Sequence, residues 1–279
     1  MIDRKRFSLN RIIAPSLTLS EFLELTAQLG LNKVELRNDL DGRDPVDDMK
    51  PSDFARMAAD KGIEVISINA LQKFNLAAAR PKTSEELPRL LELATAIGCK
   101  AVVLCPNNDA ADDRSEAQRY GETVDALTTF GVLFQAAGVL GYVEPLGFGI
   151  SSLASLVVTQ EAVQKSGYSC YRTVIDTFHH FIGPEDQNIL GATYRISATG
   201  LVHVSGVEAD IPVKAYRDEH RILVGPGDKT KSKQQIVCLD KLGYTGDFSF
   251  EPFSPTVQTL GKAELAVAVQ NSLDYLVSH

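Results

Sequence analysis

Residues 101–144 contain a strand, a helix and a second strand in close succession. The first segment reads AVVLC at 101–105, the second RSEAQRYGETVDALTTFGVLFQAA at 114–137 and the third GYVE at 141–144. The short segments are apolar and rich in β-branched residues, as buried parallel strands are, whereas the long segment has the apolar spacing of a helix. This order predicts two parallel strands joined by a right-handed crossover.

The same unit recurs along the chain. The predicted strands are Ser8–Ile13, Lys33–Arg37, Glu64–Ala70, Ala101–Cys105, Gly141–Glu144, Thr173–Asp176, Leu201–Val204 and Asp247–Glu251. The predicted helices are Thr18–Leu29, Ser52–Lys61, Ser84–Ile97, Arg114–Ala137, Thr159–Ser166, Lys233–Leu242 and Gly261–Val277. The first helix opens with Thr18 and Glu21 in capping-box spacing, and several of the others stop at a glycine, which supports these boundaries.

The number of units indicates the fold class. Eight strands in 279 residues give about 35 residues per unit, the size of a βα repeat. We therefore predict an α/β protein with one domain, a single (β/α)₈ TIM barrel over residues 1–279. The alternative is a doubly wound open sheet, which usually has a glycine-rich turn after its first strand. Here Ala14-Pro15-Ser16 follows that strand, so the barrel is favoured.

Composition and charge restrict the class of partner. The sequence is 44% hydrophobic and 23% charged, as in an ordinary globular protein, and its formal net charge is −8. Such a charge repels phosphate backbones and anionic lipids, so we expect a small-molecule substrate and neither nucleic acid nor a membrane as partner. The sequence does not decide between a monomer and a homo-oligomer. The four cysteines form no CxxC pair and no long apolar run follows the charged N-terminal residues, so we expect reduced thiols and a cytoplasmic location.

Four polar residues stand at the ends of the last predicted strands, where function lies in a barrel of this kind. Glu144, Asp176 and Glu251 end the fifth, sixth and eighth strands, and His203 lies near the end of the seventh. One strand-end aspartate alone is more often a helix cap, but four such residues on consecutive strands converge on the barrel axis. Three carboxylates and one imidazole suit one divalent metal ion, such as Mn²⁺, Mg²⁺, Co²⁺ or Zn²⁺.

The chain resembles the xylose isomerase-like TIM barrel family, which includes sugar phosphate isomerases, sugar epimerases and endonuclease IV. The most specific segments are IDTFH at 175–179, FEP at 250–252 and the strand-end Glu144. The resemblance also covers VELR at 34–37, INAL at 68–71, FN at 74–75, VH at 202–203 and DEHR at 218–221. Within the family it is strongest to the inosose isomerases.

This resemblance implies roles for particular residues. It implies a metal site made by Glu144, Asp176, His203 and Glu251, with His179 and Arg221 facing the substrate. Relatives usually have an acidic residue two or three positions after the histidine of the seventh strand, where this chain has Ser205-Gly206. Since that acid helps to hold an additional ion in multi-metal relatives, we expect a single ion here.

Three further polar residues have two interpretations each, and two phenylalanines are expected to shape the site. Glu35 and Arg37 alternate at the end of the second strand, so they either bind substrate or pair with each other. Asn69, near the end of the third strand, either binds substrate or caps the following loop. Phe74 and Phe253 are expected to form an apolar wall that excludes water from the substrate.

These parts suit an enzyme that transfers a proton next to a carbonyl group. We expect a metal-dependent isomerase that moves the ketone of a cyclic polyol or sugar through an enediolate, with Glu144, Glu251 and His179 as catalytic residues. Which glutamate is the base stays open. The resemblance points to 2-keto-myo-inositol, an intermediate of inositol catabolism. The alternatives are a ketose 3-epimerase or inosose dehydratase of the same fold, an endonuclease IV-like nuclease, and a metal-binding protein without turnover.

Overall fold

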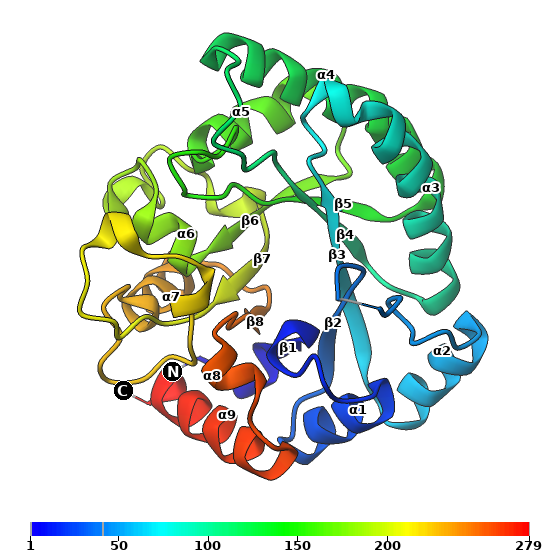
Figure 1. The fold of residues 1–279 in the computed structure, drawn as a ribbon, viewed down its shortest axis with the longest axis vertical. Helices are drawn as coiled ribbons and strands as arrows, with labels where there is room; N and C mark the ends of the chain where they lie inside the picture. Colours follow the sequence, from blue (N-terminus) through cyan, green and yellow to red (C-terminus); the bar gives the residue numbers. More distant parts are fainter. Residues whose placement is uncertain (1, 41, 279) are drawn as a thin grey trace.

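Parallel strands close into a barrel in the order in which they occur in the sequence (Figure 1). The computed structural model describes residues 2–40 and 42–278, and within them eight strands form the barrel. They are β1 Phe7–Asn10, β2 Lys33–Arg37, β3 Glu64–Gln72, β4 Ala101–Cys105, β5 Leu140–Val143, β6 Tyr171–Asp176, β7 Thr199–Val204 and β8 Phe248–Phe250. Since β1 also pairs with β8, the sheet has no open edge, and the predicted TIM barrel is confirmed.

Helices surround the barrel (Figure 1). They are α1 Leu19–Gln28, α2 Pro51–Asp60, α3 Arg80–Ile97, α4 Glu116–Ala137, α5 Leu156–Ser166, α6 Thr177–Ile182, α7 Ser232–Lys241, α8 Pro255–Gln258 and α9 Lys262–Val277. The predicted capping box of Thr18 and Glu21 begins α1. Gly98 ends α3 with φ 69°, a left-handed conformation that few other residues adopt. None of the helices within the described residues is long and apolar enough to cross a bilayer.

Residues of each strand alternate between the inside and the outside of the barrel. In β4, Ala101, Val103 and Cys105 belong to one buried apolar cluster, and Val102 and Leu104 belong to another. The first cluster fills the barrel, whereas the second lies between the strands and the helices. This alternation turns the thiol of Cys105 inward at the carboxyl end of the strand.

Several predicted boundaries were wrong, and α6 and α8 were not predicted. The first strand ends at Asn10 instead of Ile13, because the Asn10 side chain accepts a hydrogen bond from the Ile12 N–H and starts a 3₁₀ turn. The third strand continues beyond Ala70 to Gln72. No helix was predicted directly after the sixth strand, yet α6 begins at Thr177, and Asp176 caps it by accepting hydrogen bonds from the next two backbone N–H groups.

Candidate metal centre

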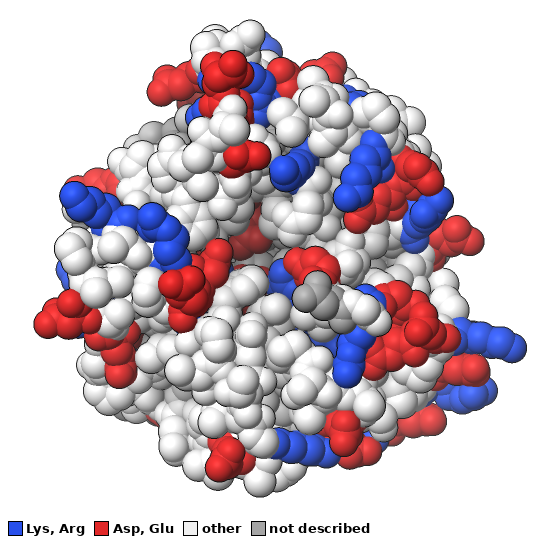
Figure 2. Space-filling model, viewed as in Figure 1, with Lys and Arg blue, Asp and Glu red and all other residues white. Residues whose placement is uncertain are grey.

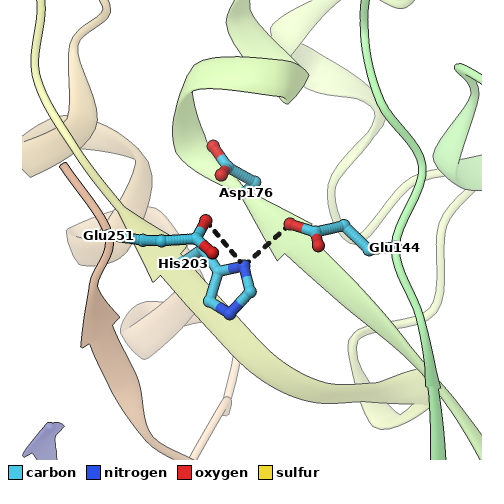
Figure 3. Close-up of side chains that lie close together, drawn as sticks. All are labelled: Glu144, Asp176, His203 and Glu251. Carbon is cyan, nitrogen blue, oxygen red and sulfur yellow. Dashed lines mark hydrogen bonds and ion pairs between the residues drawn. The ribbon is translucent and has the colours of Figure 1, made fainter. Parts of the chain in front are cut away.

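Four side chains from consecutive strands meet at the carboxyl end of the barrel (Figure 3). Glu144 and Glu251 directly follow β5 and β8, Asp176 ends β6, and His203 lies in β7. One potential ligand atom from each residue lies within 4.8 Å of every other, and all four residues are buried. The predicted convergence of these residues is therefore confirmed.

His203 lies between the two glutamates. Its Nδ1 is 2.7 Å from Oε1 of Glu144 and 3.2 Å from Oε2 of Glu251 (Figure 3). Burial alone would lower the pKa of His203, but the carboxylates of Glu251, Glu35 and Glu144 hold it well above its ordinary value. Burial, aided by repulsion from Glu144, raises the pKa of Glu251 to about 7. The cluster therefore stabilises positive charge at its centre, and its oxygen and imidazole donors fit a divalent cation.

Two buried arginines hold the carboxylates in place. Nη2 of Arg221 donates to Oδ2 of Asp176 at 2.5 Å and to Oε2 of Glu251 at 2.9 Å. Nη1 of Arg37 donates to the other oxygen of Glu251, also at 2.9 Å. Arg37 also forms a two-pronged pair with Asp39, with both distances 2.7 Å. These charge-assisted bonds fix the orientation of Glu251 from both sides.

A cavity of about 370 Å³ opens over the cluster. Its lining residues are Arg37, Asp39, Asn69, Gln72, Lys73, Cys105, Pro106, Asn108, Glu144, Leu146, Phe148, His179, Asp218, Arg221, Glu251 and Phe253. The size suits a small ligand. The hollow at the centre of the face in Figure 2 has acidic side chains in and beside it, and acidic and basic groups are mixed over the rest of that face.

The structure separates the predicted substrate residues into two groups. Arg37, Asn69 and Arg221 line the cavity, and the ring of Phe253 lies against both guanidinium groups, 5.2 Å from Arg37 Cζ and 4.6 Å from Arg221 Cζ. Phe74 does not line it, because its side chain is fully buried in the core between strands and helices. The prediction that Phe74 forms part of an apolar wall of the substrate site is therefore wrong.

Glu35 also lies outside the cavity lining. It is fully buried below the cluster, where its Oε2 is 3.1 Å from Nε2 of His203. Glu35 and Arg37 form no hydrogen bond or ion pair with each other; each is held by other partners. Both interpretations of Glu35, as a substrate ligand and as the partner of Arg37, are therefore wrong.

His179 points into the cavity from α6. Its ring packs edge-on against Phe148 and Phe178, with centroid distances of 5.0 and 5.2 Å. Burial lowers the pKa of His179, against the attraction of Asp176, and keeps the imidazole neutral. Among the described residues its Nδ1 has no hydrogen-bond partner, so this atom is available to a bound molecule.

Sequence-based prediction missed several residues of the site, among them three that contact the predicted residues. Asn10 donates to Oε1 of Glu251 at 3.1 Å, but the first strand was expected to continue past it. Cys105 lies with its Sγ 3.6 Å from Oε2 of Glu144, although it was expected to be no more than a reduced thiol. Asp39 binds Arg37 at the rim. These three residues fit the pattern that predicted the four metal ligands, which is a polar residue at or just after a strand end.

Ser205 lies at one of the two positions where the resemblance implies an acidic residue. Its Oγ accepts a hydrogen bond from Nε of Arg221 at 3.0 Å. Ser205 therefore orients Arg221 instead of adding a carboxylate to the cluster.

Comparisons with known proteins agree with this geometry. The family model described as xylose isomerase-like TIM barrel matches residues 23–278. No curated protein sequence matches the chain. A solved xylose isomerase domain-containing protein from Salmonella typhimurium LT2 is 36% identical, with a TM-score of 0.93 and coverage of 100% of this chain and 99% of that chain.

Two further solved structures share the fold at lower identity. The IolI protein, solved with a bound zinc atom, is 21% identical with a TM-score of 0.86, and 98% of each chain is covered. A D-psicose 3-epimerase from Clostridium cellulolyticum H10, solved with D-tagatose, is 15% identical with a TM-score of 0.76, covering 97% of this chain and 98% of that one. Because the family model covers most of the sequence, the chain belongs to the xylose isomerase-like TIM barrel family.

Proposed function

We propose that the protein is a metal-dependent isomerase that moves the ketone of a cyclic polyol or sugar to a neighbouring carbon, with 2-keto-myo-inositol as substrate. The observation that carries the proposal is the pair of buried glutamates, Glu144 and Glu251, on either side of His203 at the base of a small cavity. Membership of a family that contains isomerases and epimerases supports an enzyme. The zinc in the structure of the IolI protein supports a metal at this site.

Glu144, Asp176, His203 and Glu251 would hold one divalent ion. When bound, the ion supplies Lewis-acid chemistry that stabilises the negative charge developing on the substrate carbonyl. The absence of an acidic side chain at Ser205, which binds Arg221 instead, supports a single ion.

The two glutamates are the proton-transfer groups. They approach the cavity from β5 and β8, on opposite sides of His203 (Figure 3). One carboxylate can take the proton from the hydroxyl-bearing carbon, and the other can return a proton to the former carbonyl carbon. The neutral imidazole of His179 exchanges a proton with a substrate oxygen, and Arg221 orients a neighbouring hydroxyl.

The walls of the cavity support a polyol as substrate. Asp39, Asn108 and Asp218 at the rim offer acceptors and donors to hydroxyl groups. Phe148 and Phe253 contribute apolar surface that keeps water from the reacting carbons. A nuclease would need a continuous basic surface around the site, and the mixed charges in Figure 2 favour a small neutral substrate instead.

A substrate panel tests the proposal. Purified protein with Mn²⁺ would be incubated in D₂O with inososes and ketohexoses, and the products identified by NMR, with Glu144→Gln as the inactive control. We expect 2-keto-myo-inositol to give a keto-inositol isomer of unchanged oxygen content, with deuterium at the former carbonyl carbon. A dehydrated diketone as the main product would show a dehydratase. A ketohexose epimerised at C3, with no inosose reacting, would show an epimerase.

A further inference from the structure

Glu35 and His203 form a buried contact beneath the metal cluster. Oε2 of Glu35 lies 3.1 Å from Nε2 of His203, on the edge of the ring away from the nitrogen that faces Glu144 and Glu251. Neither Glu35 nor His203 has solvent-exposed surface. The proposed mechanism gives Glu35 no role. A buried carboxylate must nevertheless be stabilised by specific partners.

Hydrogen-bond donors surround the Glu35 carboxylate. Ser67 Oγ and Asn69 Nδ2 donate to Oε2 at 2.5 and 2.8 Å, and Asn10 Nδ2 donates to Oε1 at 3.3 Å. A carboxylate held in this way is ionised and can only accept hydrogen bonds. The ring nitrogen of His203 that faces it must therefore carry a hydrogen.

We propose that Glu35 is a positioning residue that fixes the hydrogen of His203 on Nε2 and so presents Nδ1 to the metal as a ligand. The inference rests on the metal site of the proposed function. Metal-binding histidines commonly donate their second N–H to a carboxylate, which sets the orientation of the ring and raises its basicity as a ligand. Here β2 supplies the carboxylate and β7 the imidazole, from strands that are separated by β1 and β8 around the barrel.

Asn10 extends the arrangement to a second ligand. Its Nδ2 donates both to Glu35 and to Oε1 of Glu251, at 3.3 and 3.1 Å. Its own Oδ1 is occupied by the Ile12 N–H and by Arg37, so the amide cannot turn over without losing both bonds. The position of Glu35 is thus coupled to that of Glu251 as well as to that of His203.

Co²⁺ titrations of full-length variants test the proposal. In Glu35→Gln, an amide replaces the carboxylate among hydrogen-bond donors. If the amide oxygen accepts from His203, the amide NH₂ group faces Nδ2 of Asn10, which is also a donor. We expect the Co²⁺ affinity of this variant, followed by visible absorption, to fall about 10- to 100-fold. Ser67→Ala removes one donor without adding a clash, and should lower affinity in the same direction but less. Glu64→Gln, at the amino end of β3 and paired with Lys100, is the matched control and should bind as the wild type does.

NMR of the Zn²⁺-loaded protein tests the tautomer directly. Long-range ¹H–¹⁵N spectra of His203 should show hydrogen on Nε2 and metal on Nδ1 in the wild type, and a loss of this single state in Glu35→Gln. Circular dichroism and thermal unfolding show which variants are folded, and Ser67→Ala carries the test if Glu35→Gln is not.

The outcomes separate the two proposals. Wild-type protein that binds no Co²⁺ would overturn the metal site and Glu35's role with it. Wild-type binding together with unchanged affinity and an unchanged His203 spectrum in the folded variants would overturn the positioning role alone. Metal bound through Nε2 in the wild type would also overturn it.

Discussion

At the scale of single residues, Glu144 and Glu251 have the same position in their strands but different partners. Glu251 is held by Arg37, Arg221 and Asn10, and none of these three binds Glu144. Oxygens of Glu144 lie near His203 and the thiol of Cys105. We expect substitution of either glutamate to affect catalysis, whereas only substitution of Glu251 disturbs buried ion pairs with arginines.

We expect Glu144→Gln and Glu251→Gln to lower kcat by about 10²- to 10⁴-fold with smaller changes in KM, because each removes a proton-transfer group. Glu251→Gln should also lower the melting temperature, because it leaves two buried arginines with fewer charged partners. Steady-state kinetics, metal analysis and thermal unfolding measure these effects. Turnover near that of the wild type in either variant would contradict the assignment.

His179→Asn should preserve the fold and reduce turnover less than either glutamine variant. The Nδ1 of His179 bonds no described residue, so stability loses only ring packing against Phe148 and Phe178. Kinetics beside melting curves check this expectation. A loss of turnover as large as that of Glu144→Gln would instead place His179 in the main proton transfer.

At the scale of elements, the loop between β4 and α4 shapes the cavity rim through one buried acid. Asp112, whose side chain is 2% exposed, accepts hydrogen bonds from Arg114 and Asn107. These bonds hold the loop that carries the lining residues Pro106 and Asn108. The hydrogen bond from Arg114 holds the pKa of Asp112 well below its ordinary range.

This pKa gives a pH dependence of stability. A carboxyl with a depressed pKa in the fold stabilises it above the unfolded-state pKa of about 4, and this contribution is lost as pH falls below that value. We expect Asp112→Asn to lower the free energy of unfolding by about 1–3 kcal/mol at pH 7. Urea unfolding at pH 7 and at pH 3 would measure it, and the difference from wild type should shrink at pH 3. An equal difference at both values would show that charge is not the cause.

At the scale of the whole molecule, the sequence was sufficient to predict the barrel fold and the four candidate ligands. The bounds of β2 and β4 agree with prediction, because β4 is a short apolar run and β2 is a short segment in which charged and apolar residues alternate. The six residues of α6 are too few to show helical periodicity, so that helix was missed. The place of Glu35 could not be predicted, because it depends on a contact with His203, which lies 168 residues away in the sequence.

The intact protein should bind about one divalent ion per chain. A chelator should abolish activity, and Mn²⁺ or Co²⁺ should restore it. Because the ion would bind the folded state, it should also raise the melting temperature. Metal analysis, assays and thermal unfolding check these points. Full activity in metal-free protein, or two tightly bound ions per chain, would contradict a single catalytic ion.

The pairing of β1 with β8 also determines when the site comes into existence during synthesis. Asn10 and Arg37 leave the ribosome early, but the carboxylate that both of them bind, Glu251, lies just beyond β8. A nascent chain that has not yet added β8 lacks both the ring closure and one of the four candidate ligands. The four candidate ligands are therefore complete only after the last strand of the barrel has been synthesised.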